Sequence, residues 1–488
     1  MVDDFFRNRL DQMIDLRHPL AVLANRMPWQ EIEASLAQRW ARQVKAGKKI
    51  EGLDLFGPVS VVAGGGTSNA GRPRLPTRLM VALLYLKHAF NESDEEVIQR
   101  WGETPTWQYF SGNEYFEHQW PCDPTQLGRF RKALGEEGVE ELLARTMEVA
   151  VTLKLIARKE LARVVVDSTV QEKAVAHPTD SKLLETARVK VVEAAKANGI
   201  ELKQTYAKEG RHLSFKAGRY AHARQFRRMR KAIKRQRTIV GRLQRDVGRK
   251  MSTLSQAVQE ALSVTLDKAK RLVVQTSSRK AAGNRAKLYS WHAPEVECIS
   301  KGKSRKPYEF GVKASIAVTH KQGLIVGART FPGNPYDGHT LAEQIEQTTN
   351  LLQDLKVKPT TAIVDLGYRG VDHLVPAQII HRGRFKTLSA QQRKWLKRRQ
   401  AVEPVIGHLK ADHRMDRCWL KGKNGDAIHT VLCAAGFNLR WLLRAIARYG
   451  LKAVYLCLIW VTAIVAVAVK WATGHRQNGS LQLAQAAG

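Results

Sequence analysis

Two short runs of β-branched and apolar residues each lead into an aspartate, and this repeated pattern constrains the fold of the chain most strongly. The run 163–170 places Asp167 after three valines, and the run 361–370 places Asp365 after alanine, isoleucine and valine. Apolar runs without polar alternation predict strands that are buried on both faces. Because polar groups gather at the ends of such strands, we expect an α/β layer with a functional site at one edge of its sheet.

The segments around these two runs complete the predicted layer. Apolar residues alternate with polar or small ones over 310–328, and Gly323 marks the turn of the β-hairpin that this alternation predicts. A helix is expected over about 340–355. Residues 180–275 lack proline and are rich in helix formers, which predicts a helical insertion at about 180–285.

The chain is strongly basic, with 80 Lys and Arg against 45 Asp and Glu and a formal net charge of +35. A balance of this kind favours a polyanionic partner, most often nucleic acid, while membrane surfaces and acidic polymers stay open. Cationic residues crowd the segment 211–250, where Asp246 is the single acid. A solvated helical hairpin would also explain the crowding, but we favour contact with DNA phosphates. The residues expected to make it are Arg227, Arg228, Arg230, Lys231, Lys234 and Arg235.

A third carboxylate stands in the segment 398–410. On one continuous helix, Arg399, Glu403 and Lys410 would share a face, so that the carboxylate holds a metal and the cations hold phosphate oxygens. Pro404 requires the helix either to kink near Glu403 or to start there, and a start there would remove Arg399 from the shared face. A basic surface helix with one glutamate is the alternative interpretation of this segment.

The N-terminal part of the chain is predicted to be mainly helical, and no candidate metal ligand is assigned to it. The segment 63–73 is rich in glycine, but Arg72 and Pro73 stand where a phosphate-binding loop needs Lys followed by Ser or Thr, so a linker is expected. The helical segment 123–150 begins with an N-cap signal and basic residues. It is predicted to be either a DNA-reading helix-turn-helix or a plain packing unit. Its basic residues, predicted to be exposed, are Arg129, Arg131 and Lys132.

The cysteines and the two ends of the sequence indicate the cellular compartment of the protein. Five widely spaced cysteines without a CxxC pair argue against a disulfide framework and a structural zinc site, and they fit a reducing compartment. The N-terminus lacks the pattern of a secretory signal. The segment 453–469 carries no charged residue and is expected to be a packed terminal helix or an appended apolar segment, in preference to a membrane span.

Four stretches of the chain together resemble bacterial insertion-sequence transposases of the DDE class, in the insertion-sequence-five family. They are 166–169 (Val-Asp-Ser-Thr), 333–339 (Gly-Asn-Pro-Tyr-Asp-Gly-His), 364–370 (Val-Asp-Leu-Gly-Tyr-Arg-Gly), and Arg399 with Glu403 and Lys410. The resemblance covers the chain from near its N-terminus to about residue 449. The family signature has a tyrosine three positions before the arginine, where this chain has Leu396 with Trp395 beside it.

The resemblance implies an RNase H-like catalytic core in which Asp167, Asp365 and Glu403 hold two Mg²⁺ or Mn²⁺ ions, about 4 Å apart in such sites. Asp337 is the substitute if one of the three is misassigned. His339 and His408 are expected to form hydrogen bonds or to contact phosphate. The implied domains are a helical segment 1–62, a linker 63–75, a helical and possible DNA-binding domain 76–158, a catalytic domain 159–449 containing the insertion, and a tail 450–488.

The implied function is that of an enzyme which binds the terminal inverted repeats of its element, cleaves DNA and transfers the strand to a target. Double-stranded DNA would be its partner, a homodimer or higher multimer its working form, and the nucleoid region of the cytoplasm its location. Two alternatives remain: a non-catalytic basic DNA-binding protein derived from a transposase, and a basic protein anchored to a membrane by its tail.

Overall fold

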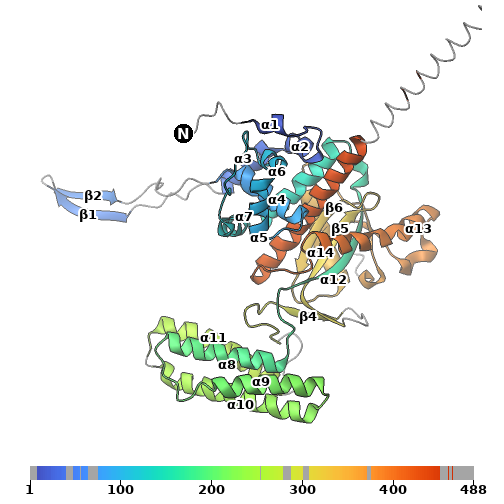
Figure 1. The fold of residues 1–488 in the computed structure, drawn as a ribbon. Helices are drawn as coiled ribbons and strands as arrows, with labels where there is room; N and C mark the ends of the chain where they lie inside the picture. The colour runs from blue at the N-terminus through green and yellow to red at the C-terminus, as the bar shows by residue number, and fades with distance from the viewer. Residues whose placement is uncertain are drawn as a thin grey trace, which may run out of the picture. The chain divides into compact units, whose positions relative to one another are not determined.

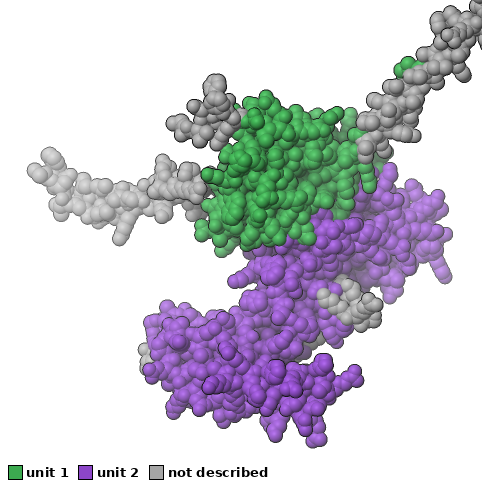
Figure 2. Space-filling view, in the orientation of Figure 1, with its two compact units in different colours: residues 1–160, 351–357, 434–488 green, residues 161–350, 358–433 purple. Residues whose placement is uncertain are grey.

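The structure of the chain is a computed structural model, shown in Figure 1. It describes residues 8–39, 48–54, 57–63, 75–252, 254–277, 287–300, 307–370 and 375–450, together with positions 460 and 464. Most of the predicted Gly-rich linker and of the apolar tail therefore lie outside the described residues. The chain divides into two compact units, which Figure 2 distinguishes by colour. The first unit comprises residues 1–160, 351–357 and 434–488, and the second comprises residues 161–350 and 358–433.

The first unit is mainly helical. Its helices are α1 (Leu10–Met13), α2 (Pro19–Ala24), α3 (Trp29–Arg39), α4 (Thr77–Ala89), α5 (Asp94–Glu103), α6 (Pro105–Phe110) and α7 (Pro124–Thr152). Helix α4 forms the centre of the unit because every residue from Leu79 to Ala89 is buried. Residues 434–450 end a long helix, Gly422–Gly450, and a Cβ at Gly436 would overlap the backbone of His88 in α4. Glycine therefore permits a close approach of two helix backbones at this point.

Residues 48–63 correct the prediction of a helical segment over 1–62. They form an antiparallel hairpin of β1 (Lys48–Asp54) and β2 (Gly57–Ala63), with Asp54 opposite Gly57. Val59, Val61 and Val62 favour extended backbone because β-branched side chains restrict the rotamers available in a helix. The helical spacing of apolar residues upstream does not continue through this segment.

Helix α7 begins with the predicted N-cap. The Asp123 side chain accepts a hydrogen bond from the Thr125 amide, and Gln126 completes the capping box. Gly135 has non-helical dihedral angles (φ 65°, ψ −171°), so two helical pieces meet there. Arg129 and Lys132 are exposed as predicted, whereas Arg131 is buried. The expectation of an exposed Arg131 is therefore wrong.

The reason for the burial of Arg131 is a bidentate ion pair with Asp94 in α5. The two N–O distances are 3.0 and 2.9 Å, and the Lys87 ammonium lies 2.6 Å from the same carboxylate. Burial alone would raise the pKa of Asp94, but Arg131 and Lys87 outweigh it and lower the pKa to about 2. The basic start of α7 thus contributes to the interior of the first unit.

The second unit contains a six-stranded mixed sheet. Its strands are β3 (Arg163–Glu172), β4 (Glu297–Ser300), β5 (Tyr308–Thr319), β6 (Ile325–Phe331), β7 (Thr361–Ile363) and β8 (Gln378–Ile380). The strand order is β4-β5-β3-β7-β8, and β6 also pairs with β5. The pairs β3–β7 and β7–β8 are parallel, whereas β5 is antiparallel to β3, β4 and β6. The predicted strands and the β5–β6 hairpin are confirmed, and the mixed α/β class with them.

Helix α12 (Asp337–Leu351) packs against the hairpin and begins three residues before the predicted helix. The Gln347 side chain is buried and pairs with the backbone of Ala328 in β6, donating to its carbonyl at 3.0 Å and accepting from its amide at 3.1 Å. This pairing satisfies backbone groups on an edge strand that would otherwise lack partners.

The segment between β3 and β4 holds four helices: α8 (Asp180–Ala197), α9 (Ala207–His222), α10 (Phe226–Met251) and α11 (Gln256–Gln275). They pack side by side as a bundle (Figure 1). Leu184, Ile239, Leu243 and Leu272 are among the buried residues of a core that belongs to this bundle. Ile239, Val240 and Leu243 of the basic segment thus face the other helices, whereas Phe226 at the start of α10 is exposed. The exposed cations of α10 lie on its outer side.

A buried ion cluster ties the end of β3 to the rest of the second unit. The Lys173 ammonium lies 2.7 Å from Asp426 and 2.9 Å from Glu295, and all three side chains are at least nine-tenths buried. Gln171 donates to the Asp426 carbonyl at 3.0 Å, and the Cys418 amide donates to the Glu172 carbonyl at 2.7 Å. These contacts fix the strand that carries Asp167.

One described helix, Gly422–Gly450, is long and apolar enough to cross a membrane by length and composition. The same test is passed by buried core helices, and 61% of its most apolar window is buried. The feature is therefore weak evidence for a membrane span. The predicted candidate at 453–469 lies outside the described residues, apart from positions 460 and 464.

Candidate active site

Asp167 and Asp365 stand at equivalent points of two adjacent parallel strands. Val165 of β3 is paired with Ile363 of β7, and each aspartate follows its strand partner by two residues. Because the two strands are paired in parallel, the positions that follow these paired residues lie beside each other, and this register brings the two side chains to one place. The two apolar runs predict this convergence, but Asp167 lies within β3, opposite Ile316 of β5, and not at the end of its strand as expected.

Local backbone contacts orient both carboxylates. Asp167 accepts a hydrogen bond from the Ser168 amide at 2.8 Å, and Asp365 accepts one from the Leu366 amide at 2.8 Å. Asp365 is the N-cap of a short 3-10 helix, η4 (Leu366–Tyr368), which turns the chain away from β7. Asp167 is largely buried, whereas Asp365 is exposed. One acid is thus fixed within the sheet, and the other stands at its rim.

Arg399 joins the two aspartates. Its guanidinium lies 3.6 Å from the Asp167 carboxylate and 3.8 Å from that of Asp365, and its side chain is only 14% exposed. The two carboxylates therefore converge on one positive charge. This charge compensates two acids that would otherwise repel each other at close range.

The neighbours of Arg399 explain how it is held. Arg398 donates hydrogen bonds to the carbonyls of His320 and Lys321 in the β5–β6 turn, the first at 3.1 Å. Trp395 in α13 (Ala390–Lys397) carries the Arg163 guanidinium 3.5 Å from its ring centroid. Stacking of this kind attaches the helix to the start of β3. Trp395 thus provides an anchor next to Leu396, the position where the family signature has tyrosine.

Glu403 lies in the first turn of α14 (Val402–Asp412), and its side chain is exposed. Arg399 belongs to the preceding 3-10 helix, η7 (Arg398–Ala401). The helix therefore starts one residue before Glu403, and Pro404 occupies the first turn, where a missing N–H leaves no helical bond unmade. Arg399 and Glu403 consequently do not lie on one continuous α-helical face. Lys410 is in the last turn of α14 and is partly exposed.

Helix α14 packs against β3, which places Glu403 on the element next to Asp167. Among the described residues, no three carboxylates bring their oxygen atoms within 4.8 Å of one another. The acids nonetheless suit a divalent cation, because Asp167 and Asp365 already share one cationic partner and supply the oxygen donors that Mg²⁺ and Mn²⁺ prefer. The donor set fits a hard divalent ion better than zinc.

Asp337, the substitute acid, is engaged elsewhere. Its carboxylate lies 3.0 Å from the ammonium of Lys313, which also donates to the Pro335 carbonyl at 2.6 Å. Lys313 is buried in β5. Sequence analysis did not identify this lysine as a partner of Asp337 beside the candidate site. The alternation over 310–328 assigns Lys313 to the polar positions, so the pattern carried no signal that this lysine is buried and paired.

The loop that carries Asp365 rests against Asp337. A Cβ at Gly367 would lie 3.2 Å from the Asp337 Oδ2 atom, so glycine allows the close approach. Tyr368 is buried beside it, and its pKa is raised by burial and by the carboxylates of Asp337 and Asp167. Tyr336 donates a hydrogen bond to the Arg369 carbonyl at 3.1 Å. Asp337 and its neighbours thus brace the turn that follows Asp365.

The two histidines named from the sequence take separate places. The ring of His339 packs edge-on against Tyr336, with 5.7 Å between the centroids. His408 Nδ1 lies 2.6 Å from the Asp412 carboxylate one turn further along α14, and both side chains are exposed. These contacts give His339 a packing role and His408 an ion-pairing or hydrogen-bonding role.

The six cations predicted to contact DNA all lie on α10, five of them exposed: Arg227, Arg228, Arg230, Lys231 and Lys234. Arg235 is half-buried and forms an ion pair with Glu209 of α9, with N–O distances of 2.6 and 3.1 Å. Five of the six cations are therefore exposed, whereas Arg235 already has an acidic partner.

Two parts of the chain match known protein families. Residues 8–133 match the family described as Transposase domain (DUF772), and residues 276–439 match the family described as Transposase DDE domain. The second match contains Asp365, Arg399 and Glu403, whereas Asp167 lies between the two matched ranges. The chain belongs to the DDE transposases of insertion sequences.

A curated relative covers part of the chain. The uncharacterized protein ORF8 in the nfe locus of Rhizobium meliloti is 41% identical over 224 residues, which are 46% of this chain and 95% of that protein. No solved structure matches the chain. Class membership makes this a transposase, an enzyme class that acts on DNA and typically uses divalent metal ions.

Proposed function

We propose that this transposase binds the terminal inverted repeats of an insertion sequence, hydrolyses the phosphodiester to free 3′ hydroxyls, and joins them to target DNA. The observation that carries this proposal is the convergence of Asp167 and Asp365, on adjacent parallel strands, around the Arg399 guanidinium. With Glu403 on the packed helix α14, these acids would hold two Mg²⁺ or Mn²⁺ ions. When bound, such ions supply the Lewis-acid activation of an in-line displacement at phosphorus.

The residues of the chain have separate roles in this proposal. The Ser168 and Leu366 amides orient the two aspartates, so the acids are positioned before substrate arrives. Arg399 balances the charge of both carboxylates, and its planar fork of five N–H donors also suits a phosphate of the scissile strand. Lys410, two turns beyond Glu403, is assigned to a neighbouring phosphate.

We assign the sheet and its flanking helices to an RNase H-like core into which the basic bundle α8–α11 is inserted. Support comes from the mixed strand order, from Asp167 within β3, and from Asp365 two residues beyond the end of β7. The exposed cations of α10 would follow the backbone of duplex DNA and neutralise several phosphates. Because two element ends are joined in one event, the working form is assigned as a homodimer or higher multimer on nucleoid DNA.

The test is cleavage of the DNA that flanks the reading frame, after short inverted repeats have been located in it. Asp167→Ala, Asp365→Ala and Glu403→Ala should each abolish magnesium-dependent strand cleavage while leaving a gel shift with the same DNA intact. Glu193→Ala is the matched control, because Glu193 is an exposed acid of α8 that pairs with Lys190 of the same helix. Cleavage retained by all three site variants would remove the assignment and leave a non-catalytic DNA-binding protein.

A further inference from the structure

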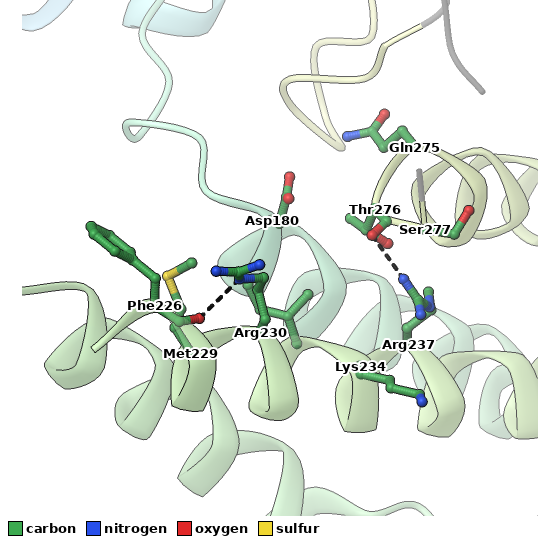
Figure 3. Close-up of a pocket in the computed structure, with 10 residues that line it drawn as sticks. Asp180, Phe226, Met229, Arg230, Lys234, Arg237, Gln275, Thr276 and Ser277 are labelled. Atoms are coloured by element: carbon green, nitrogen blue, oxygen red, sulfur yellow. Dashed lines mark hydrogen bonds between the residues drawn. The ribbon is translucent and has the colours of Figure 1, made fainter. Parts of the chain in front are cut away.

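The helical bundle contains a groove of about 890 Å³ at one end. Its walls come from the start of α8, the first half of α10 and the end of α11, and Figure 3 shows their side chains around the hollow. The volume lies within the roughly 300–1,000 Å³ that is usual for ligand sites. The groove lies entirely within the bundle and does not involve the three acids of the candidate active site.

Two kinds of side chain line the same wall of this groove. Phe226 is 50% exposed, and Met229 and Ile233 are partly exposed next to it, so the wall presents apolar surface to solvent. Two cations lie on the same helix: Arg230 follows Met229, and Lys234 follows Ile233. A large aromatic ring left half in water among cations indicates a ligand that offers both an apolar face and negative charge.

The cations retain donors for such a ligand. Arg230 Nε donates to the Phe226 carbonyl at 3.2 Å, and Arg237 donates one bond to the Thr276 carbonyl at 2.8 Å, as the dashed lines in Figure 3 mark. Each guanidinium carries five N–H groups, so each of these bonds uses one donor of five. The groove can therefore bind phosphate oxygens without breaking the contacts that hold its own side chains.

Duplex DNA matches the cations of this wall but not its aromatic ring, because it presents phosphates outward and keeps the faces of its bases stacked inside. Its backbone would satisfy Arg230 and Lys234 but would leave the Phe226 ring uncovered. An unpaired strand presents phosphates and base faces together, and stacking on aromatic rings within a cationic groove is how single strands are bound without sequence preference. We propose that this groove binds single-stranded DNA, with a base stacked on Phe226 and phosphates on Arg230 and Lys234.

Asp180 orients a bound strand, because it determines which wall the phosphates face and which wall the base edges face. Its carboxylate stands at the start of α8, facing the groove from the side opposite α10 (Figure 3). An acid repels phosphate but accepts hydrogen bonds from the N–H groups on the edges of bases, including the ring N–H of thymine. The phosphates therefore run along α10, and the base edges point toward Asp180.

This inference deepens the proposed function, because it rests on the proposal that the chain acts on DNA, where strand cleavage produces unpaired ends. The test uses the full chain and measures fluorescence anisotropy with labelled oligo(dT) of about 20 nucleotides, longer than the roughly 4–16 nucleotides of a single-strand site. A blunt duplex of the same length is measured in parallel. Phe226→Ala should weaken binding to oligo(dT) by about tenfold, within the range for loss of one stacked base, and leave duplex binding unchanged.

Three further variants and one control separate stacking from charge and from folding. Phe226→Leu keeps an apolar side chain but removes the ring, so it should behave like Phe226→Ala, whereas Phe226→Tyr should bind oligo(dT) like the parent chain. Lys234→Gln should weaken oligo(dT) binding more than Lys270→Gln, a matched control at an exposed lysine of α11 that does not line the groove. Equal losses for oligo(dT) and duplex in the Phe226 variants, or no loss for either, would overturn the inference.

Failure of this inference and failure of the proposed function give different results. If Asp167→Ala leaves cleavage intact while Phe226→Ala weakens only oligo(dT) binding, the groove stands and the catalytic assignment fails. If cleavage depends on the three acids while the Phe226 variants bind oligo(dT) like the parent chain, the catalytic assignment stands and the groove does not bind single strands.

Discussion

The guanidinium of Arg399 lies 3.6 Å from the carboxylate of Asp167, and the same group lies 3.8 Å from Asp365. A residue that the sequence assigns to phosphate is therefore the counter-charge of two proposed metal ligands. Arg399 can be the counter-charge first and the phosphate ligand later. A divalent cation that binds these carboxylates competes with Arg399 for the same oxygen atoms. A guanidinium displaced in this way becomes available to the substrate.

Arg399→Gln tests this competition. Removing the guanidinium should lower the magnesium concentration for half-maximal cleavage about fivefold, which corresponds to about 1 kcal/mol for a partly exposed ion pair. The maximal rate should fall as well, because the phosphate contact is lost. Magnesium titrations of cleavage measure both quantities, and Lys394→Gln, at an exposed lysine of α13, is the control. An unchanged or higher magnesium requirement would contradict the counter-charge role.

Asp94→Asn should destabilise the first unit at neutral pH, because it leaves the buried Arg131 without its bidentate partner. The folded-state pKa of Asp94, about 2, lies below its ordinary value of 3.8, so the carboxylate stabilises the unit above that value. The pKa difference corresponds to about 2 kcal/mol, which is lost as the pH falls from 3.8 toward 2. Urea unfolding followed by tryptophan fluorescence should show the difference between parent and variant shrinking below about pH 4. A difference that stays constant to low pH, or an equal effect of Glu95→Gln on the same helix, would contradict this account.

Asp426→Ala should reduce the free energy of unfolding of the second unit by about 3 kcal/mol, the lower end of the range for breaking a buried ion pair. Lys173 keeps Glu295 as a partner, which limits the loss. The neighbouring Asp416 is exposed, so Asp416→Ala should have little effect. Thermal unfolding of both variants measures the contrast, and equal stability of the two would show that the cluster does not hold the end of β3.

Lys231→Gln and Arg235→Gln should differ in duplex binding, although both remove one charge from α10. Each phosphate contact contributes about 0.9 to the slope of log affinity against log salt, so Lys231→Gln should lower that slope by about 0.9. Arg235 is paired with Glu209, and its removal should lower the slope by much less. Anisotropy titrations between roughly 50 and 200 mM salt give both slopes. Equal changes would mean that Arg235 leaves Glu209 to bind DNA.

The strands of the candidate site could be predicted because their residues carry the information locally. Valines 164–166 and the run before Asp365 predict buried strands, and β3 and β7 are found there. The β5–β6 hairpin follows from its alternation and from Gly323. Strand β8 (Gln378–Ile380) escaped prediction because it holds only two apolar residues, which do not form an apolar run like the one that marks β7.

The partners of charged residues could not be predicted in the same way, because they depend on which elements pack together. Arg131 and Arg129 look alike in the sequence, yet the first is buried against Asp94 and the second is exposed. Arg399 looks like a free phosphate ligand until β3 and β7 are placed beside it. Lys313 occupies a polar position of an alternating strand, and its burial follows from pairing with Asp337, which lies in another element.

The account depends on three acids acting together at one site, and the most direct measurement is magnesium-dependent cleavage of an element end by the parent chain and by Asp167→Asn, Asp365→Asn and Glu403→Gln. These substitutions remove one charge each and keep the size of the side chain. The account predicts that every one of them loses cleavage while circular dichroism and duplex affinity stay those of the parent chain. Cleavage at the parent rate by any one of these variants would contradict the shared site.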